Sequence, residues 1–366
     1  MSFRPPVRDD LAELPGYHSP QLDVAHRLNT NESPEPPPDA FRQAVAEKVA
    51  ALDWHRYPDR SATELRTKLA EHHGGAAAGI SADNIFVANG SNEVLQTIML
   101  AWGGTGRSIL TFEPTYAMHG QIARVTGTGV IEIERASDFT IDADAAVATL
   151  REHKPIVTFL CSPNNPTGLV EPPALVERVL DTVEDFGLLV VDEAYAQFSD
   201  WTALDFFDED KPLIITRTFS KTWAMAAARL GYLIAPTWIV ERLNTAILPY
   251  HLDAISQVAG STALDYETEM AARVARMVEQ RGVIQAGLGE LGIEFWPSQS
   301  NFVLFRPPSG GVGEIDGAEL WQRLVDQGVL VRNCSTWPRL DGCLRVTVGT
   351  ADENGAFLSA LTAILG

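Results

Sequence analysis

Residues Thr216–Leu230 read TRTFSKTWAMAAARL, and this stretch places a lysine in an unusual setting. Lys221 follows the hydroxyl side chains of Thr218 and Ser220 and precedes a run of small and apolar residues that ends at Arg229. Lysine is usually a solvated surface residue, but burial near other cations lowers the pKa of its ammonium group. Such a lysine is suited to act as a nucleophile or a Schiff-base former. A helix with one lysine lying along its surface has a similar pattern. The stretch alone therefore does not distinguish a reactive lysine from a surface lysine.

Lys221 lies just beyond one of seven short apolar runs that alternate with helical patterns. Several of these runs lack polar alternation, which is typical of strands buried on both faces. We therefore expect an α/β fold built on one open, seven-stranded, mostly parallel sheet. The predicted strands are Ile85–Ala88, Ser108–Phe112, Val130–Ile133, Ile156–Cys161, Leu188–Asp192, Leu213–Thr216 and Gly231–Ala235.

Polar side chains follow most of these predicted strands. In an open parallel sheet, ligands bind beyond the carboxyl ends of the strands, so these side chains are expected to converge. One of the segments, Asn89–Glu93, leads into a helix whose free backbone N–H groups favour an anion. The other segments are Glu113–Tyr116, Ser162–Gly168, Asp192–Tyr195 and the lysine stretch.

The remaining chain predicts three parts. Residues 1–40 are rich in proline and charge and read as an extended N-terminal arm, residues 41–254 as the large domain, and residues 255–366 as a smaller α+β domain. Strands are expected in the last part at Asn301–Phe305, Val329–Val331 and Leu344–Val348. His72 and His73 lack metal-ligand spacing and are expected at an exposed helix end.

Composition excludes several classes of partner. The formal net charge of −20 repels nucleic acid and anionic membranes, and no apolar run reaches the roughly 18 residues that a membrane helix needs. Cys161, Cys334 and Cys343 lack C-x-x-C spacing, which favours reduced thiols and a cytoplasmic location. We expect Cys161, at the end of an apolar run, to pack in the core.

The polar set matches what pyridoxal 5′-phosphate (PLP) requires of a protein, which is an amine for its Schiff base, a carboxylate for its pyridine nitrogen and a phosphate site. Lys221 and Asp192 supply the first two. A nicotinamide site is not indicated, because no G-x-G-x-x-G follows a first strand, and no phosphate-binding G-x-x-x-x-G-K-[ST] occurs either. Magnesium would require further carboxylates at neighbouring strand ends, and no metal is expected.

Three motifs carry a family resemblance: SPNNPTG, DEAY, and TFSK with an arginine eight residues after its lysine. With them the chain resembles the fold-type-I PLP-dependent aminotransferases. It is similar in particular to the histidinol-phosphate aminotransferases, since further matches run in family order over nearly the whole chain. These matches are Tyr17, LNTNESP, RYPD, NGSNEVLQ, EPTY, LPYHLDAISQ, PSQSNFVLF and CLRVTVGT. Two departures are TWAMAAAR after the lysine, which affects packing behind it, and Asn92 in place of an aspartate.

The resemblance implies roles for the cofactor site. Lys221 would form the Schiff base, Asp192 would pair with the pyridine nitrogen, and Asn165 and Tyr195 would contact the phenolic oxygen. Tyr116 would stack on the ring. The phosphate would be bound by Ser91, Asn92, Thr218, Ser220 and Arg229, and by Tyr57 of the other subunit, which implies a homodimer with shared active sites.

For the substrate, the resemblance implies Tyr17, Asn31, Arg332 and Arg345, and a second half-reaction with 2-oxoglutarate and glutamate. An arginine binds phosphate and carboxylate equally well, so Arg345 alone does not separate histidinol phosphate from an aromatic amino acid such as phenylalanine. A PLP-dependent decarboxylase of an amino-acid phosphate and a non-catalytic ligand-binding protein are further alternatives. The expected reaction is transamination between L-histidinol phosphate and 2-oxoglutarate, as in histidine biosynthesis.

Overall fold

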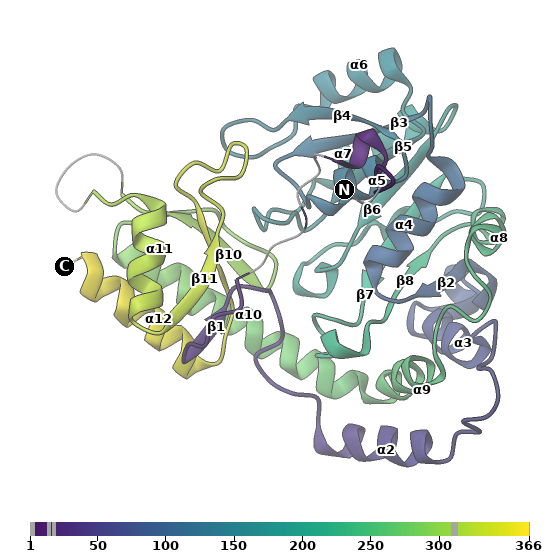
Figure 1. The fold of residues 1–366 in the computed structure, drawn as a ribbon, viewed down its shortest axis with the longest axis horizontal. Coiled ribbons are helices and arrows are strands. Elements are labelled where there is room, and N and C mark those ends of the chain that lie inside the picture. The colour runs from purple at the N-terminus through teal and green to yellow at the C-terminus, as the bar shows by residue number, and fades with distance from the viewer. Residues whose placement is uncertain (1–3, 13–15, 17–19, 309–313, 366) are drawn as a thin grey trace.

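Two sheets organise the chain (Figure 1). The computed structural model describes residues 4–12, 16, 20–308 and 314–365. The larger sheet has seven strands, in which β8 is antiparallel to both neighbours and all other pairs are parallel. This confirms the predicted sheet. In spatial order its strands are β2 (Ile85–Ala88), β8 (Gly231–Ile234), β7 (Leu213–Thr218), β6 (Leu188–Asp192), β5 (Val157–Cys161), β3 (Ser108–Glu113) and β4 (Gly129–Glu134).

Both faces of the large sheet are covered by helices, which is why its strands read as unbroken apolar runs. On β6, Val190 packs against one face, with side chains of α4 (Ser91–Trp102), α5 (Met118–Val125) and α8 (Thr237–Ala246). The next residue, Val191, packs against the opposite face, with α6 (Ala143–His153) and α7 (Pro173–Val183). Three further helices pack near β2 and β8, namely α2 (Asp39–Ala50), α3 (Thr63–His72) and α9 (Ala254–Ala263).

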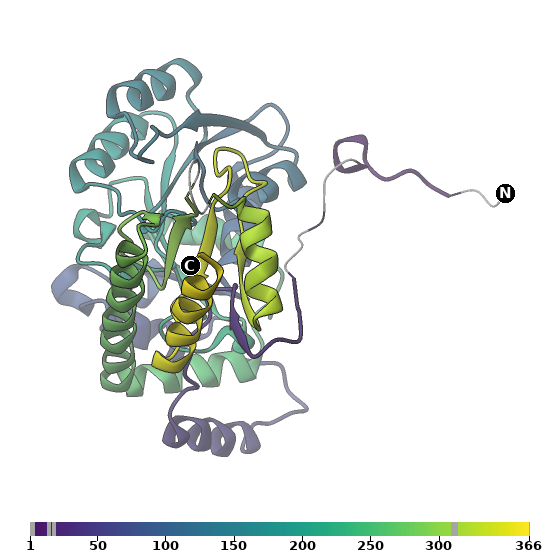
Figure 2. The same cartoon turned by 90° about the vertical axis from the view of Figure 1, so that its left-hand side faces the viewer.

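The second sheet has five strands, in the order β1 (His26–Leu28), β11 (Val329–Asn333), β12 (Leu344–Thr347), β10 (Phe302–Arg306) and β9 (Glu294–Phe295). The three expected C-terminal strands are present, whereas β1 and β9 were not predicted. β1 belongs to the expected arm and pairs in parallel with β11. Figure 2 shows α10 (Glu267–Glu290), α12 (Ala351–Leu365) and α11 (Gly317–Asp326) side by side against this sheet.

One expectation about the helices is wrong. His73, directly after α3, is only 7% exposed, and its Nε2 lies 2.9 Å from the hydroxyl of Tyr232 on β8. His73 therefore lies at a buried helix end rather than an exposed one. Cys161 is buried in the core, as expected. A short helix, α1 (Asp9–Ala12), precedes β1. Among the helices formed by described residues, none combines the length and the apolar character needed to cross a bilayer.

Candidate active site

Lys221 lies in the turn that follows β7. Its Nζ donates a hydrogen bond to the carbonyl oxygen of Thr30, at 3.2 Å, and lies 5.8 Å from the centre of the Tyr195 ring. Burial lowers the pKa of Lys221 to about 8, and the charges of Arg345 and Arg229 act in the same direction. A lysine with this pKa is partly neutral near pH 8 and can act as a nucleophile or a base.

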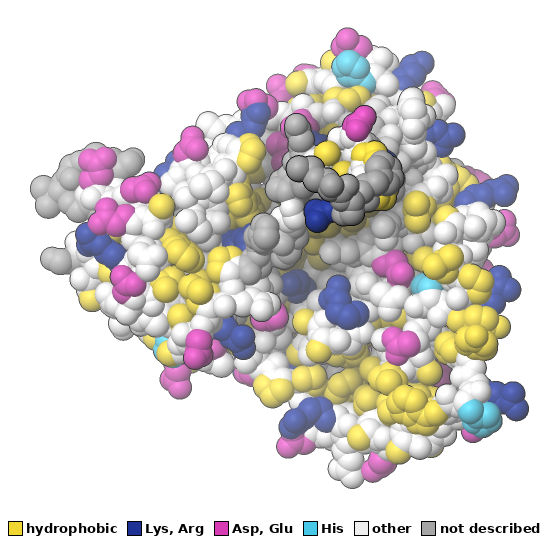
Figure 3. Space-filling view, in the orientation of Figure 1, with side chains coloured by type: hydrophobic (Ala, Val, Ile, Leu, Met, Phe, Trp, Pro, Cys, Tyr) yellow, Lys and Arg dark blue, Asp and Glu magenta, His cyan; other side chains and the backbone are white. Residues whose placement is uncertain are grey.

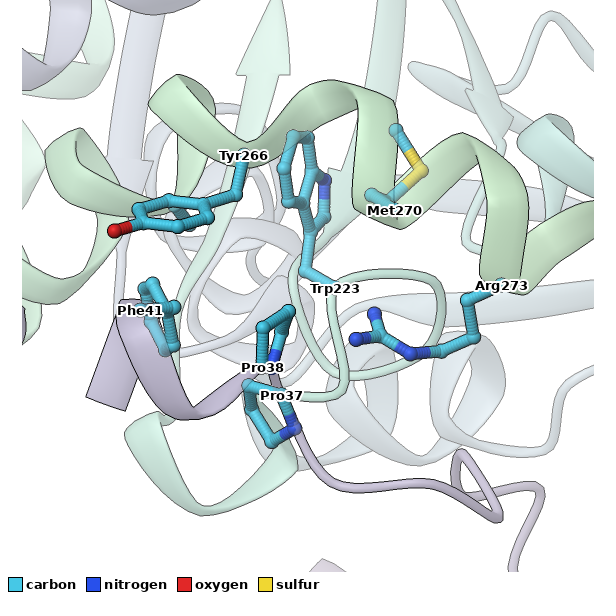
Figure 4. Close-up of a pocket in the computed structure, with 8 residues that line it drawn as sticks. Pro37, Pro38, Phe41, Trp223, Tyr266, Met270 and Arg273 are labelled. Atoms are coloured by element: carbon cyan, nitrogen blue, oxygen red, sulfur yellow. The ribbon is translucent and has the colours of Figure 1, made fainter. Parts of the chain in front are cut away.

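The turn that carries Lys221 is held from behind by a small apolar cluster (Figure 4). Trp223 is 4% exposed and packs with Phe41, Tyr266 and Met270, while Arg273 donates to the carbonyl oxygen of Thr222 at 3.1 Å. These partners come from α2, from the residues before α10 and from α10 itself. The unusual tryptophan after the lysine thus anchors the turn to two helices.

Asp192 ends β6, is 2% exposed and makes hydrogen bonds through both carboxylate oxygens. Its Oδ2 lies 3.0 Å from Nε2 of His119, and its Oδ1 accepts from the hydroxyl of Thr216 at 3.1 Å and the backbone N–H of Ala194 at 3.2 Å. The His119 ring stacks on Phe159 with 4.6 Å between centroids. Sequence reasoning missed His119, although it lies three residues after Tyr116, which is one helical turn.

An anion cradle forms where α4 begins. The first N–H groups of a helix have no intrahelical partner and carry partial positive charge. Arg229 packs directly over Gly90, because a Cβ added at Gly90 would lie 2.7 Å from its Nη2. A Cβ at Gly231 would lie 2.2 Å from the backbone nitrogen of Ser91, so β8 also approaches closely. In the neighbouring turn, the hydroxyl of Thr218 accepts from the N–H of Ser220 at 3.1 Å. Guanidinium, hydroxyls and helix terminus together suit a phosphate.

The residues predicted for the cofactor ring and its phenolic oxygen lie in two places. Tyr116 lies next to the beginning of α4, whereas Asn165 contacts Arg345 of the second sheet. Tyr116 donates from its hydroxyl to Oδ1 of Asn92 at 3.0 Å, next to the α4 terminus, and its ring meets that of His119 edge to face. Tyr195 is buried, which raises its pKa to about 12. Asn165 accepts a hydrogen bond from Nη1 of Arg345.

Of the residues predicted for the substrate, Asn31 and Arg345 lie against Tyr195 and Asn165 of the predicted cofactor site. Asn31 is 2% exposed, donates from Nδ2 to the Tyr195 hydroxyl at 3.0 Å and accepts from Thr347 at 3.1 Å. Arg345 is buried, with Nη2 3.3 Å from the carbonyl oxygen of Asn29. Arg332 is its cross-strand partner and lies over the Trp337 ring.

Two predicted residues are not brought to this site within the chain. Tyr57 is 80% exposed and stacks on Tyr250 with 4.5 Å between centroids. Tyr17 lies outside the described residues. Among the described residues, no three His, Cys, Asp or Glu side chains are grouped so that they could hold a metal.

The geometry therefore combines an amine of lowered pKa, a carboxylate with an imidazole partner, an anion cradle and a second cation at Arg345. This donor set fits PLP: Lys221 offers the amine, Asp192 the partner for a protonated ring nitrogen, and Arg229 with α4 the phosphate site. The glycines at positions 90 and 231 leave the cradle open where any side chain would fill it.

Comparison with known proteins gives one consistent family. The family model for aminotransferase class I and II matches residues 25–361. A histidinol-phosphate aminotransferase of Thermobifida fusca is 44% identical over 369 residues, which is 99% of this chain and 96% of the relative. A histidinol-phosphate aminotransferase of Mycobacterium marinum is 43% identical over 361 residues, which is 97% of this chain and 91% of the relative.

A solved structure shares the fold. The histidinol-phosphate aminotransferase of Sinorhizobium meliloti, in complex with pyridoxal-5′-phosphate, superposes with a TM-score of 0.87 at 22% identity. The match covers 98% of this chain and 97% of that one.

Proposed function

The chain belongs to the class I and II aminotransferases, and from this premise we propose that it transfers the amino group of L-histidinol phosphate to 2-oxoglutarate, giving imidazole acetol phosphate and L-glutamate. The proposed substrate rests on the identity of 43–44%, over nearly the whole chain, to relatives named histidinol-phosphate aminotransferase. The arrangement of Lys221, Asp192 and Arg345 supports the reaction type.

PLP is the proposed cofactor. When bound, it supplies an electron sink that makes the Cα proton of an amino substrate acidic. Lys221 would hold the cofactor covalently, and Arg229, Ser91, Asn92, Thr218 and Ser220 would hold its phosphate. Asp192 would keep the ring nitrogen protonated, since a buried carboxylate favours a cation beside it. Tyr116 would cover the ring, and Asn165 and Tyr195 would face its phenolic oxygen.

Proton transfer at the substrate is proposed for Lys221. Its Nζ would take the proton from Cα as a general base and deliver it as a general acid to C4′ of the cofactor, on the other side of the amino nitrogen. A pKa of about 8 suits both roles near neutral pH. The carbonyl of Thr30, 3.2 Å away, holds the amine in place.

Arg345 and Arg332 would bind the anionic end of the substrate, with Asn31 beside them. The guanidinium of Arg345 is presented by a buried strand and fixed through Asn165 and the carbonyl of Asn29, so it is already oriented for two parallel hydrogen bonds. The same group would receive the phosphate of histidinol phosphate in one half-reaction and a carboxylate of 2-oxoglutarate in the other.

A homodimer with shared active sites is also proposed. Tyr57 and Tyr250 form an exposed stacked pair, and Trp54 and Leu248 are 69% and 77% exposed. Figure 3 shows hydrophobic side chains gathered on one face around α9. Exposed aromatic and aliphatic side chains in such numbers are typical of a subunit interface. Tyr57 would then reach the phosphate site of the second copy. The cytoplasm stays the proposed compartment, because Cys161, Cys334 and Cys343 are all buried free thiols.

The test is a comparison of kcat/KM for histidinol phosphate and phenylalanine, each with 2-oxoglutarate. We expect histidinol phosphate to be preferred by more than about tenfold, or ~1.4 kcal/mol of transition-state binding. A preference for phenylalanine of that size would make the chain an aromatic aminotransferase. Release of carbon dioxide from an amino-acid phosphate would make it a decarboxylase, and no turnover with any amino donor would indicate a ligand-binding protein.

A further inference from the structure

Glu32 is a carboxylate at the active site to which the proposed chemistry gives no role. It is exposed, and its Oε2 accepts a hydrogen bond from the hydroxyl of Thr30 at 2.9 Å. The carbonyl of the same Thr30 accepts from Nζ of Lys221 at 3.2 Å. Glu32 is also close enough for its charge to oppose the lowering of the Lys221 pKa. Its side chain therefore lies at the reacting end of the site.

The segment from Asn29 to Glu32 contacts two charged groups and carries a third, in chain order. The carbonyl of Asn29 accepts from Arg345, and the carbonyl of Thr30 accepts from Lys221. The carboxylate of Glu32 follows two residues later. A guanidinium, an amine and a carboxylate are thus arranged along one short stretch of backbone, with the amine between the other two.

Glu32 differs from Asp192 in its free capacity to accept hydrogen bonds. Asp192 accepts from Thr216 and Ala194 and pairs with His119, and its remaining capacity is assigned to the cofactor ring nitrogen rather than to a substrate. Within the described parts of the chain, Oε1 of Glu32 accepts no hydrogen bond. An exposed carboxylate oxygen at the mouth of a site is available to a ligand donor.

The proposed substrate has three polar groups on the branches of one carbon: a phosphate, an amine and an imidazole. Arg345 matches the phosphate and Lys221 acts at the carbon that carries the amine, which leaves the imidazole without a partner. An imidazole ring donates from N–H and becomes a cation when protonated. On the basis of the proposed function, we propose that Glu32 is a specificity-determining residue whose carboxylate accepts a hydrogen bond from the imidazole ring of histidinol phosphate.

The test uses the PLP-loaded full chain with two amino donors, histidinol phosphate and phenylalanine. Glu32→Ala should lower kcat/KM for histidinol phosphate about 10- to 100-fold, because a site built to bind a donor discriminates strongly when that contact is lost. The value for phenylalanine should stay within about twofold, since a phenyl ring offers no donor. Glu35→Ala is the matched control, because Glu35 is a nearby carboxylate that pairs with Arg276 at the surface. It should change neither value.

A pH series separates substrate contact from a role in shaping the turn. Free imidazole titrates near pH 6.5, so the wild-type preference for histidinol phosphate should rise as pH falls through that range. Glu32→Gln, which keeps an acceptor but loses the charge, should flatten this rise. Lys221 also acts on this region, and phenylalanine measured in parallel corrects for its titration. The substrate phosphate loses its second proton at about pH 6, and this affects wild type and Glu32→Gln alike, so the difference between the two proteins reports the imidazole contact. If Glu32→Ala lowers kcat/KM equally for both donors, or for neither, the role of Glu32 is overturned while the proposed function stands. A wild type that does not use histidinol phosphate would overturn the proposed function and this inference with it.

Discussion

The pKa of Lys221 is set by residues that are remote in sequence. Burial is the largest cause of its lowering, Arg345 and Arg229 add to it, and Glu32 acts against it. Arg345 comes from β12 and Glu32 from the segment after β1. The reactivity of this one amine is therefore a property of the assembled site, and the sequence around Lys221 indicates only that such a lowering is possible.

We predict that PLP attaches to the cofactor-free protein at a rate that follows this pKa. The neutral amine is the nucleophile, so the rate should fall about tenfold per pH unit below pH 8 and level off above it. Stopped-flow measurement of the visible absorbance between about pH 6 and pH 10 gives the profile. Arg345→Gln should move the plateau to higher pH, because it removes a cation that lowers the pKa. A wild-type rate that climbs steadily to pH 10 would show that the pKa of Lys221 is not lowered.

Sequence patterns identified most of the polar groups of the site but not all of their partners. Lys221 and Asp192 stand at or beside the ends of apolar runs of the large sheet, where a parallel sheet brings ligand-binding groups together. Arg229 precedes the antiparallel β8, and Arg345 lies on β12 of the second sheet, whose pairs are antiparallel. His119 lies inside a helix and shows no such signal. Its role depends on the meeting of α5 with the end of β6, which only the packed structure establishes.

At the scale of elements, the phosphate cradle depends on the close approach of α4, β8 and Arg229. Gly90 has φ of 80° and packs against the guanidinium, while Gly231 lets β8 reach the backbone of Ser91. Glycine is the residue that adopts a positive φ without strain and leaves room for such contacts.

Gly90→Ala should therefore weaken PLP binding by about tenfold or more, because the new Cβ would displace Nη2 of Arg229 and remove a charge-assisted contact worth roughly 1.5–3 kcal/mol. Cofactor titration by absorbance measures the effect. Gly106→Ala is the matched control, since Gly106 has nearly the same φ, 81°, but no atom within 4 Å of an added Cβ. It places an alanine at the same positive φ without the clash. Equal loss of affinity in both variants would show that strain, not Arg229, is responsible.

Long apolar runs were the reliable guide to the elements. Every predicted strand of the large sheet is present, because a strand buried on both faces leaves an unmistakable run such as Leu188–Asp192. β1 and β9 have three and two residues, too few to show a period. They exist because a neighbouring strand offers free backbone groups. The helix end at His73 was misjudged for a related reason, since its burial is caused by Tyr232 on a distant strand.

At the scale of the whole molecule, this buried histidine couples folding to pH. Burial lowers the pKa of His73 well below its usual value, and the charge of Arg217 lowers it further. Burial also lowers the pKa of His72. Both are neutral when folded, whereas the unfolded chain takes up protons below about pH 6.5. The contribution of these neutral histidines to the free energy of unfolding is therefore fully present above about pH 6.5. It is lost as the pH falls from there towards the pKa values of the folded state.

Removing this titration should flatten the acid side of the stability profile. Between pH 7 and pH 5 the wild type should lose at most about 2 kcal/mol more unfolding free energy than His73→Gln, which keeps a polar partner for Tyr232 but does not titrate. Denaturant unfolding at both pH values measures the difference. His153→Gln, which removes an exposed histidine from α6, should leave the profile unchanged. If His73→Gln loses as much stability as the wild type, His73 does not carry the coupling.

In the proposed homodimer, two copies of the chain complete each other's active sites. Tyr57 is 80% exposed in the single chain and stacks only on Tyr250, which is also exposed. If its hydroxyl serves the phosphate site of a second copy, the residues of one active site are divided between two chains. Lys221 and Tyr57 of the same chain would then belong to different sites, and two defective variants could complement each other.

We predict that subunit exchange between Lys221→Ala and Tyr57→Ala restores activity. Random pairing makes half of the dimers mixed. In each mixed dimer, one site combines Lys221 from one chain with Tyr57 from the other, so about a quarter of all sites should be intact. Turnover of histidinol phosphate by the mixture should approach a quarter of the wild-type value and exceed the mean of the two variants measured apart. If Tyr57 served its own chain, every mixed dimer would have one site without the lysine and one without the tyrosine. The turnover of the mixture would then equal the mean of the two variants measured apart, and this result would exclude the shared active site.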